Sequence, residues 1–234
     1  MRSVRARIER GGERLWRMED FSDLPSMPVA QALSRLTKVG FIQRLSKGTY
    51  YKAGQSAFGK TRPNTAAIRN LANRGRALFP SGTAAANLLG FTTQAAARGE
   101  LSTSSASVPR KLIGADAIVH TRRPEAWRNL NETEAAILDF IRHGGRTGEL
   151  PPDETLKRMY GLLSKQKTFA HLLEAAPSEP PRARAILGAL GEKIGIDRKK
   201  LLVLRRSLNP LSTFDFGIFT ALPNAKDWQA KGRR

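Results

Sequence analysis

The chain has 234 residues and is 40% hydrophobic, which is enough for one large or two ordinary folded domains. Its 40 lysines and arginines against 20 aspartates and glutamates give a formal net charge of +20, and such a field attracts polyanions such as nucleic acid. The absence of cysteine excludes disulfides, thiolate metal sites and cysteine nucleophiles, and three histidines leave little imidazole chemistry.

The first forty residues predict three short helices. Residues 2–10 form an amphipathic pattern with apolar side chains four apart, ended by two glycines. Residues 18–24 predict a second, shorter helix, which a proline ends. A third helix is expected over residues 26–39, with Ser26 as its N-cap and Gly40 as its C-terminal stop. Its predicted apolar stripe consists of Val29, Ala32, Leu33, Leu36 and Val39.

A basic hairpin is expected directly after the third helix. Residues 41–52 combine two short β-prone segments with a turn at residues 46–48. Three short helices followed by such a hairpin is the order of a winged helix-turn-helix. In that motif the third helix enters the major groove of DNA, and the wing contacts adjacent backbone or the minor groove. The sequence therefore predicts a winged helix-turn-helix DNA-binding domain over residues 1–60.

The side chains of the third helix and the hairpin suit contacts with duplex DNA. Arg35 can donate two hydrogen bonds to guanine, and Gln31 can pair with adenine. Neighbouring lysines and arginines can contact phosphates. The predicted DNA-binding residues are Arg2, Arg5, Gln31, Ser34, Arg35, Lys38, Arg44, Ser46, Lys47 and Thr49. The alternative is a protein–protein module with a solvated charged face, but total charge and motif agree on DNA.

A second domain is expected over residues 61–234, after a linker of small residues at 53–64. Short strands are predicted within residues 99–122, which are rich in Ser, Thr, Val and Ile. The clearest helix starts at Asn131, where Glu134 completes a capping box. The predicted helices cover residues 65–74, 83–89, 131–143, 154–173 and 181–191. The expected fold class is therefore α+β, an N-terminal winged helix-turn-helix followed by a mixed, largely helical α+β domain.

The C-terminal part adds an apolar and a basic segment. The alternation in residues 214–219 predicts a strand with one buried face, so its phenylalanines are expected in a core rather than stacked on bases. Leu211 is grouped with these apolar residues. Residues 182–206 are strongly basic, and two interpretations stay open: a solvated rim or a further DNA-contacting surface.

No catalytic, metal or cofactor site is predicted. The segment FPSGTAAANLLG lacks the lysine and glycine spacing of a phosphate loop, and a helix cap is expected at residues 81–83. The histidines His120, His143 and His171 show no ligand spacing and are expected at the surface or in packing contacts. The remaining acidic pairs lie near predicted helix starts, where negative charge favours the helix dipole. We therefore expect binding rather than catalysis.

Three segments carry a resemblance to a known family: ALSRLTKVGFIQRLSKGTYY, ALFPSGTAAANLLGFTT and LNPLSTFDFGIF. Together they resemble the AbiEi-like abortive-infection type IV antitoxins. The resemblance implies an autorepressor that binds double-stranded DNA at inverted repeats in its own promoter. It also implies a C-terminal domain that counters a toxin of the nucleotidyltransferase type.

Two alternatives remain open. One is a winged-helix transcription regulator with an unrelated ligand-sensing or dimerisation domain, and the other is a nucleic-acid-processing enzyme whose active site these motifs miss. A membrane partner is not expected, because no run approaches the roughly 20 apolar residues of a spanning helix and the N-terminal residues lack a secretory apolar core. We expect a prokaryotic protein of the cytoplasm, associated with the nucleoid.

Overall fold

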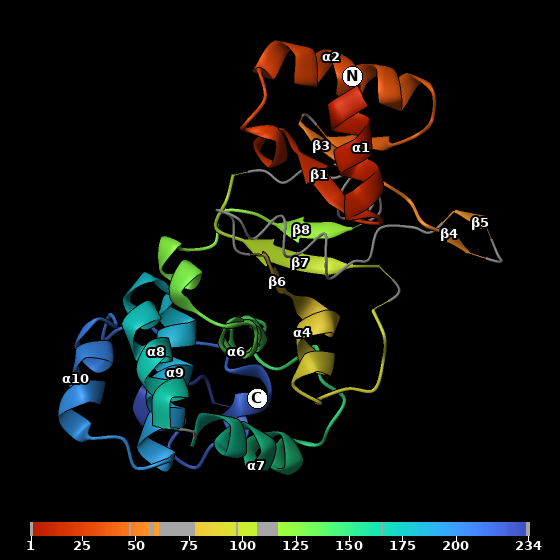
Figure 1. Cartoon of the computed structure of the whole chain (residues 1–234). Coiled ribbons are helices and arrows are strands. Elements are labelled where there is room, and N and C mark those ends of the chain that lie inside the picture. Colours follow the sequence, from red (N-terminus) through yellow and green to blue (C-terminus); the bar gives the residue numbers. More distant parts are fainter. Residues whose placement is uncertain are drawn as a thin grey trace. The chain divides into compact units, whose positions relative to one another are not determined.

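The computed structural model describes residues 2–46, 48–56, 59–60, 78–96, 98–106, 117–164 and 166–232 (Figure 1). The fold is mixed α+β, as the sequence predicts. The described residues divide into two compact units, one built from residues up to 60 and the other from residue 78 onward. The predicted domain boundary near residue 60 borders residues 61–77, which lie outside the described part together with the predicted helix over 65–74.

The N-terminal unit combines helices α1 and α2 with an antiparallel sheet of order β1-β3-β2. Strands β2 and β3 form the predicted hairpin. Its elements are α1 (Arg2–Gly11), β1 (Leu15–Arg17), the 3-10 helix η1 (Met18–Phe21), α2 (Ser26–Lys38), β2 (Gln43–Ser46) and β3 (Thr49–Tyr51). The sequence analysis missed β1, because three residues are too few to show a period of two.

Three predictions for this unit are wrong in detail. The helix expected over residues 18–24 is only the turn η1, in which Asp20 accepts a hydrogen bond of 2.7 Å from the Arg17 amide. Ser26 does not cap α2, because Pro25 occupies the N-cap position and Ser26 is the first helical residue. The stretch predicted as a linker contains two short paired strands, β4 (Gln55–Ser56) and β5 (Gly59–Lys60).

The apolar stripe holds α2 against α1 and the sheet. One buried cluster contains Val4, Ile8, Trp16, Phe21, Val29, Ala32, Leu33, Leu36, Ile42 and Tyr50. Val39, which was predicted in the stripe, is 72% exposed because it follows the last turn of α2. Gly40 ends the helix as predicted, with a φ of +69° that favours glycine. The opposite face of α2 is left toward solvent.

The C-terminal unit packs helices against a sheet of order β6-β7-β8, in which β6 and β7 are antiparallel and β7 and β8 are parallel. Its first elements are β6 (Leu78–Pro80), α4 (Gly82–Leu88), β7 (Glu100–Thr103), β8 (Ile118–His120) and η2 (Glu125–Asn129). The elements that follow are α6 (Glu132–Arg142), α7 (Pro152–Leu163), α8 (Gln166–Ala175), η3 (Ala176–Ser178), α9 (Pro181–Lys193), α10 (Arg198–Arg206), η4 (Gly217–Ala221) and η5 (Lys226–Trp228).

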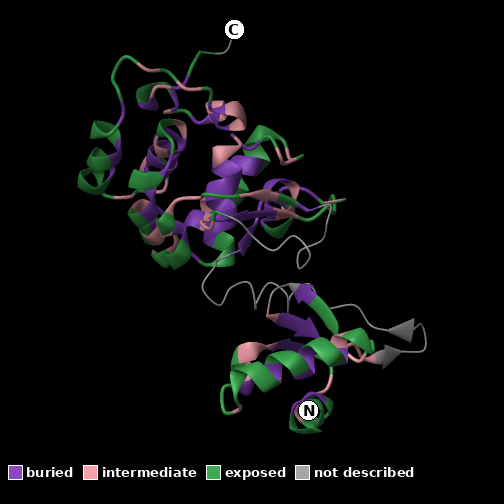
Figure 2. Cartoon of the chain, turned by 90° about the horizontal axis from the view of Figure 1, so that it is seen from above, coloured by how far each residue is buried: buried purple, intermediate pink, exposed green. Residues whose placement is uncertain are grey.

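Helix α6 lies at the centre of this unit, and its residues 134–141 are all buried (Figure 2). Asn131 and Glu134 form the predicted capping box, with both hydrogen bonds at 2.9 Å. The predicted helix over residues 154–173 is two helices, α7 and α8, and Ser164 is the C-cap of the first. Among the described residues, none of the helices has the length and apolar character needed to cross a bilayer.

The strand predicted over residues 214–219 does not form. Phe214 makes an isolated bridge, and the chain then enters η4. Gly217 breaks the alternation with a φ of +59°, and a Cβ there would lie 2.2 Å from the carbonyl oxygen of Gly144. Phe216 and Phe219 are fully buried, which confirms the core assignment, whereas Leu211 is 93% exposed.

Candidate nucleic-acid interface and polar cluster

The candidate interface is the outer face of α2. Gln31, Ser34, Arg35 and Lys38 are all exposed, and their spacing of three and four residues places them on one side of the helix. The buried stripe on the opposite side fixes the rotation of the helix. The structure therefore brings four of the predicted DNA-binding residues together.

The charge on this face is uncompensated within the described part of the chain. Helix α2 contains no aspartate or glutamate. Neither Arg35 nor Lys38 forms a side-chain hydrogen bond or ion pair with another described residue. Met27, near the start of the helix, is 70% exposed and adds apolar surface to the same face. An anionic partner could therefore bind Arg35 and Lys38 without first breaking an ion pair among the described residues.

The two predicted residues on α1 differ. Arg2 is exposed. Arg5 is also exposed, but its Nε lies 3.0 Å from Glu9 Oε1, and its guanidinium lies 4.9 Å from the centre of the Phe41 ring. Any contact between Arg5 and phosphate would therefore compete with an ion pair inside the same helix.

The β2–β3 hairpin supports only part of the set of DNA-binding residues predicted for it. Arg44 is exposed on β2, opposite Tyr50 of β3. Thr49 is buried, with 8% of its surface exposed, so its predicted contact with phosphate is wrong. It is the first residue of β3, the central strand of the sheet, and is paired with β1 on one side and β2 on the other. The side chain of Ser46 and the whole of Lys47 lie outside the described residues.

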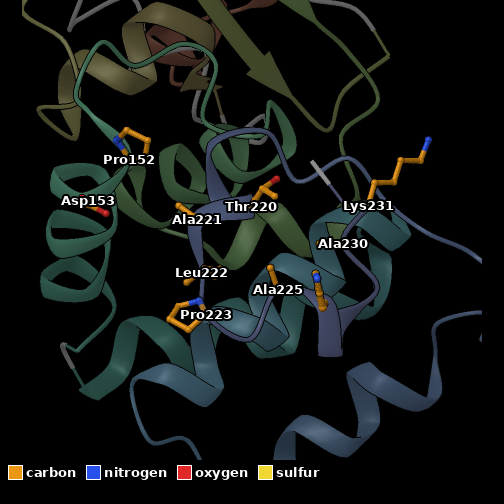
Figure 3. Close-up of a pocket in the computed structure, with 11 residues that line it drawn as sticks. Pro152, Asp153, Thr220, Ala221, Leu222, Pro223, Ala225, Ala230 and Lys231 are labelled. Atoms are coloured by element: carbon orange, nitrogen blue, oxygen red, sulfur yellow. The ribbon is translucent and has the colours of Figure 1, made fainter. Parts of the chain in front are cut away.

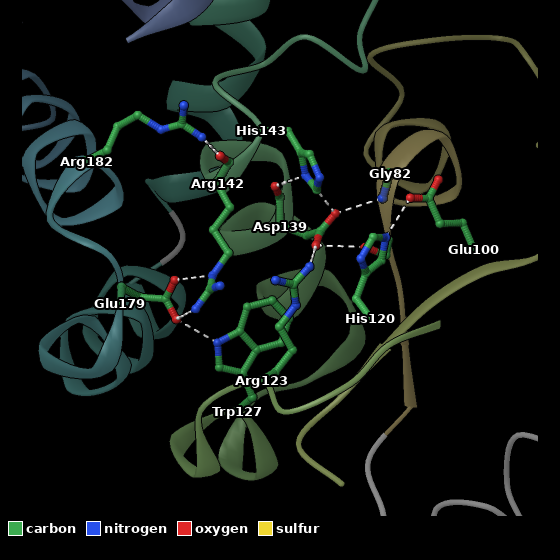
Figure 4. Close-up of polar contacts among 11 residues, drawn as sticks. Gly82, Glu100, His120, Arg123, Trp127, Asp139, Arg142, His143, Glu179 and Arg182 are labelled. Carbon is green, nitrogen blue, oxygen red and sulfur yellow. Dashed lines mark hydrogen bonds and ion pairs between the residues drawn. The ribbon is translucent and has the colours of Figure 1, made fainter. Parts of the chain in front are cut away.

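A second group of polar residues surrounds the buried carboxylate of Asp139 in α6 (Figure 4). Asp139 Oδ1 accepts hydrogen bonds from Ser81 Oγ at 2.8 Å and from Arg123 Nη2 at 2.9 Å. Its Oδ2 accepts from the amide of Gly82 at 2.7 Å, so Asp139 satisfies the first amide of α4. Ser81 is the N-cap of α4, as predicted, but its hydroxyl donates to this carboxylate rather than accepting from an amide of the helix.

His143 follows α6 and lies against the same carboxylate. Its Nδ1 lies 2.8 Å from the carbonyl oxygen of Asp139 and 3.3 Å from Oδ2. The hydrogen bond to Asp139 raises the pKa of His143, although burial acts against this. Burial alone would raise the pKa of Asp139, but the hydrogen bond and charge of His143, the Gly82 amide and Arg123 together hold it below the usual value. The buried carboxylate is therefore ionised at neutral pH.

A second histidine lies beside the first. His120 Nε2 is 2.9 Å from Glu100 Oε1, and the rings of His120 and His143 have centroids 6.3 Å apart. Glu100 lies directly against the start of α4, where a Cβ at Gly82 would come 1.9 Å from Glu100 Oε2. Gly82 also has a φ of +54°, so both space and backbone conformation require glycine there.

A further buried ion pair joins α6 to residue 179. Arg142 donates to Glu179 from Nε at 2.5 Å and from Nη2 at 3.1 Å, a two-pronged contact. Trp127 Nε1 donates to the same carboxylate at 2.7 Å. The guanidinium carbons of Arg123 and Arg142 each lie 5.4 Å from the centre of the Trp127 ring. Within this pair Glu179 neutralises the charge of Arg142, so the pair offers no net charge to a partner.

A pocket of about 830 Å³ lies between the start of α7 and residues 220–232 (Figure 3). Its ionisable lining residues are Asp153, Lys226 and Lys231. Because these carry opposite charges, the pocket favours no single class of ligand. Within the described ranges, no group of three or more histidine, aspartate or glutamate side chains is placed to hold a metal ion.

Comparison with known proteins assigns the chain to a family. Residues 7–129, more than half of the chain, match a family described as a family of unknown function, DUF6088. The chain belongs to DUF6088. The matched part of this DUF6088 protein contains α2, the β2–β3 hairpin and His120, whereas Asp139 and His143 follow it.

One solved structure is similar to this DUF6088 protein over most of its length. It is the crystal structure of the RV2827C protein from Mycobacterium tuberculosis, with 14% sequence identity and a TM-score of 0.48. The similarity covers 90% of this chain and 80% of that chain. No curated protein matches the chain.

Proposed function

We propose that this DUF6088 protein is a DNA-binding antitoxin and transcriptional autorepressor of a type IV toxin–antitoxin system active in abortive infection and phage defence. In this proposal the N-terminal unit is a winged helix-turn-helix that binds inverted repeats in the promoter of its own operon. The C-terminal unit takes part in countering a nucleotidyltransferase-type toxin. The role is one of binding and requires no catalytic step.

The observation that carries the proposal is the acid-free outer face of α2. Four polar or basic side chains share that face, and the buried stripe behind it prevents the helix from rotating them away. In the proposed complex, Arg35 donates two hydrogen bonds to a guanine and Gln31 pairs with an adenine. Lys38, at the end of the helix, neutralises a phosphate. The exposed thioether of Met27 suits contact with a thymine methyl group.

The hairpin supports the same interpretation. Strands β2 and β3 follow α2 directly, and Arg44 is exposed on the outer strand. A wing in this position contacts backbone next to the groove that holds the preceding helix. The net charge of +20 supplies the long-range attraction that precedes specific docking.

The antitoxin part of the proposal rests on the resemblance of three segments to the AbiEi-like family. Two of these segments, ALFPSGTAAANLLGFTT and LNPLSTFDFGIF, lie in the C-terminal unit. We propose that the protein counters the effect of the toxin, and the proposal does not require the two proteins to bind each other. The protein would act in the cytoplasm and at the nucleoid of a prokaryotic cell.

A charge-reversal pair tests the DNA-binding role. Purified wild-type protein is titrated against duplex DNA from upstream of its own gene and against a shuffled duplex, in a mobility-shift assay. We expect the shift to favour the upstream DNA, and Arg35→Glu to abolish that preference. Lys157→Glu, which makes the same charge change at an exposed position of α7, serves as the control. Equal loss with both variants would reduce the effect to net charge and contradict recognition by α2.

Co-expression tests the antitoxin role. A neighbouring gene for a nucleotidyltransferase is induced with and without this protein, and growth is measured. We expect rescue of growth by the wild-type protein and by the Arg35→Glu variant when both come from a foreign promoter. No rescue by either protein at matched expression would contradict the antitoxin role and leave the DNA-binding role standing.

A further inference from the structure

Two histidines lie side by side at the edge of the Asp139 cluster (Figure 4). His120 is the last residue of β8, and His143 is the C-cap of α6. Their ring centroids are 6.3 Å apart and their planes are inclined by 65°. The two side chains are 35% and 33% exposed, so a ligand in solution can reach both rings.

Each ring is oriented by a carboxylate through one nitrogen. Glu100 contacts His120 at Nε2, and Asp139 contacts His143 at Nδ1. The other nitrogens, Nδ1 of His120 and Nε2 of His143, make no hydrogen bond to a residue in the described part of the chain. A partner that holds one nitrogen fixes the orientation of the ring and leaves the other nitrogen for a ligand. Both histidines are therefore placed to exchange a proton with a bound substrate.

The loop that follows His120 adds positive charge and backbone strain. Arg123 donates to Asp139, whose carboxylate compensates its charge. Arg122 is exposed and has a φ of +59°, which is unusual for any residue other than glycine. Strained backbone of this kind is found most often at functional sites. The exposed cation Arg122 therefore favours an anionic substrate.

We propose that His120 and His143 form a general acid–base pair that cleaves RNA at a phosphodiester bond. Nδ1 of His120 takes the proton of a ribose 2′-hydroxyl while its oxygen forms a bond to phosphorus. The bond from phosphorus to the 5′-oxygen of the next nucleotide breaks, and that oxygen receives a proton from Nε2 of His143. The products are a 2′,3′-cyclic phosphate and a 5′-hydroxyl, and no oxidant, reductant or further reactant is consumed.

The geometry and the chemistry of the substrate agree. Two nitrogens on rings whose centroids are 6.3 Å apart are close enough to contact one phosphate group beside the pair, since each hydrogen bond spans about 2.8 Å. His143 is assigned as the acid because Asp139 raises its pKa and so favours the protonated imidazolium. RNA is the substrate because its 2′-hydroxyl is an internal nucleophile that DNA lacks. This activity does not depend on the proposed DNA-binding role, whose residues lie in the other unit.

The test uses the purified full chain and a labelled single-stranded RNA in buffer that contains EDTA, beside a DNA of the same sequence. We expect cleavage of the RNA alone, with cyclic phosphate ends detected by mass spectrometry. His120→Gln and His143→Gln should each lower the cleavage rate at least about 100-fold, the range for loss of one general acid or base. Circular dichroism checks that each variant is folded.

His171 provides a matched control. It has the same kind of partner, Glu134 Oε1 at 2.8 Å, but it lies away from the other two histidine rings in α8. His171→Gln, purified in the same way, should keep the wild-type rate. His120→Gln is the decisive variant, because His143 also contacts the buried Asp139 and its loss affects packing. A folded wild-type protein without RNA cleavage, equal rates in wild type and His120→Gln, or activity that EDTA removes would each overturn the proposal.

Discussion

The two units use arginine in opposite ways. On α2, Arg35 lies in solvent with no acid on its helix. In the C-terminal unit, Arg123 and Arg142 are mostly buried, and each is paired with a carboxylate that has no exposed surface, Asp139 and Glu179. A buried guanidinium is tolerated only where an acid and hydrogen bonds compensate its lost hydration, whereas an exposed one is available to a partner.

This contrast shows that the net charge of +20 does not measure the positive charge that is available to a partner. The two arginines of the C-terminal cluster are engaged by buried carboxylates: Arg123 joins the segment before η2 to α6, and Arg142 joins α6 to residue 179. An arginine is available to a partner only where no acid of the same unit pairs with it. Removal of a paired arginine should therefore lower the stability of the C-terminal unit, whereas removal of Arg35 should weaken binding by the N-terminal unit.

The largest expected effect is on folding. Asp139→Ala leaves Arg123, the Ser81 hydroxyl and the Gly82 amide buried without their partner, and should lower the free energy of unfolding by about 3–5 kcal/mol. Urea denaturation followed by circular dichroism measures the change. Glu125→Ala removes an ion pair with Arg128 at the surface and should cost less than about 1 kcal/mol. Similar losses in both variants would contradict the contrast between buried and exposed pairs.

The next effect is on DNA affinity. Arg35→Ala removes one predicted two-pronged contact with guanine and should weaken binding to the operator by about 1–3 kcal/mol. The same variant should unfold at the wild-type urea concentration, because Arg35 lies outside the cluster that packs α2. Mobility-shift titrations measure affinity. Unchanged binding would remove Arg35 from the recognition surface.

A smaller and less selective effect is expected for Lys38→Ala. A lysine that contacts only phosphate should weaken binding about equally on operator and shuffled DNA, and the slope of log affinity against log salt should become shallower by about one unit. Titrations at several salt concentrations give the slope. A loss confined to the operator would place Lys38 at a base edge.

The mildest effect is on the pH dependence of stability. The pKa of His143 is raised in the folded state, so protonation of His143 stabilises the fold. This stabilisation is fully present below the ordinary pKa of 6.5, and it is lost as the pH rises through the pKa of the folded state. His143→Gln should therefore reduce the loss of stability between pH 6 and pH 9 relative to the wild type. Urea unfolding across this range measures it, with His171→Gln as the comparison. An identical pH profile in wild type and His143→Gln would contradict the coupling to Asp139.

Local signals in the sequence predicted local features. The capping box at Asn131 and Glu134 and the glycine that ends α2 were readable because the groups involved are neighbours in the chain. The Asp139 cluster was not readable, since its partners Ser81 and Arg123 are 58 and 16 residues away and no periodicity links them. The alternation at residues 214–219 misled for a related reason, because the close approach of Gly217 to Gly144 is a tertiary contact.

The candidate interface also contains parts that could be predicted from the sequence and parts that depend on tertiary packing. The outer face of α2 was predictable because a helix converts spacing into a shared face. Thr49 was assigned to the wing as an exposed hydroxyl, but its burial depends on pairing with β1, a strand too short to predict. The pairing of His120 with His143 depends on the packing of β8 beside the end of α6, and the 22 residues between them carry no sign of it.

The three tryptophans give each unit an optical reporter of its own. Trp16 is buried in the N-terminal unit, whereas Trp127 and Trp228 are buried in the C-terminal unit. Emission from a Trp16→Phe chain would come from the C-terminal unit alone, and emission from a chain with the other two replaced by phenylalanine would come from the N-terminal unit. Fluorescence melts of this pair of chains would reveal whether the halves of the molecule lose their structure at one temperature or at two.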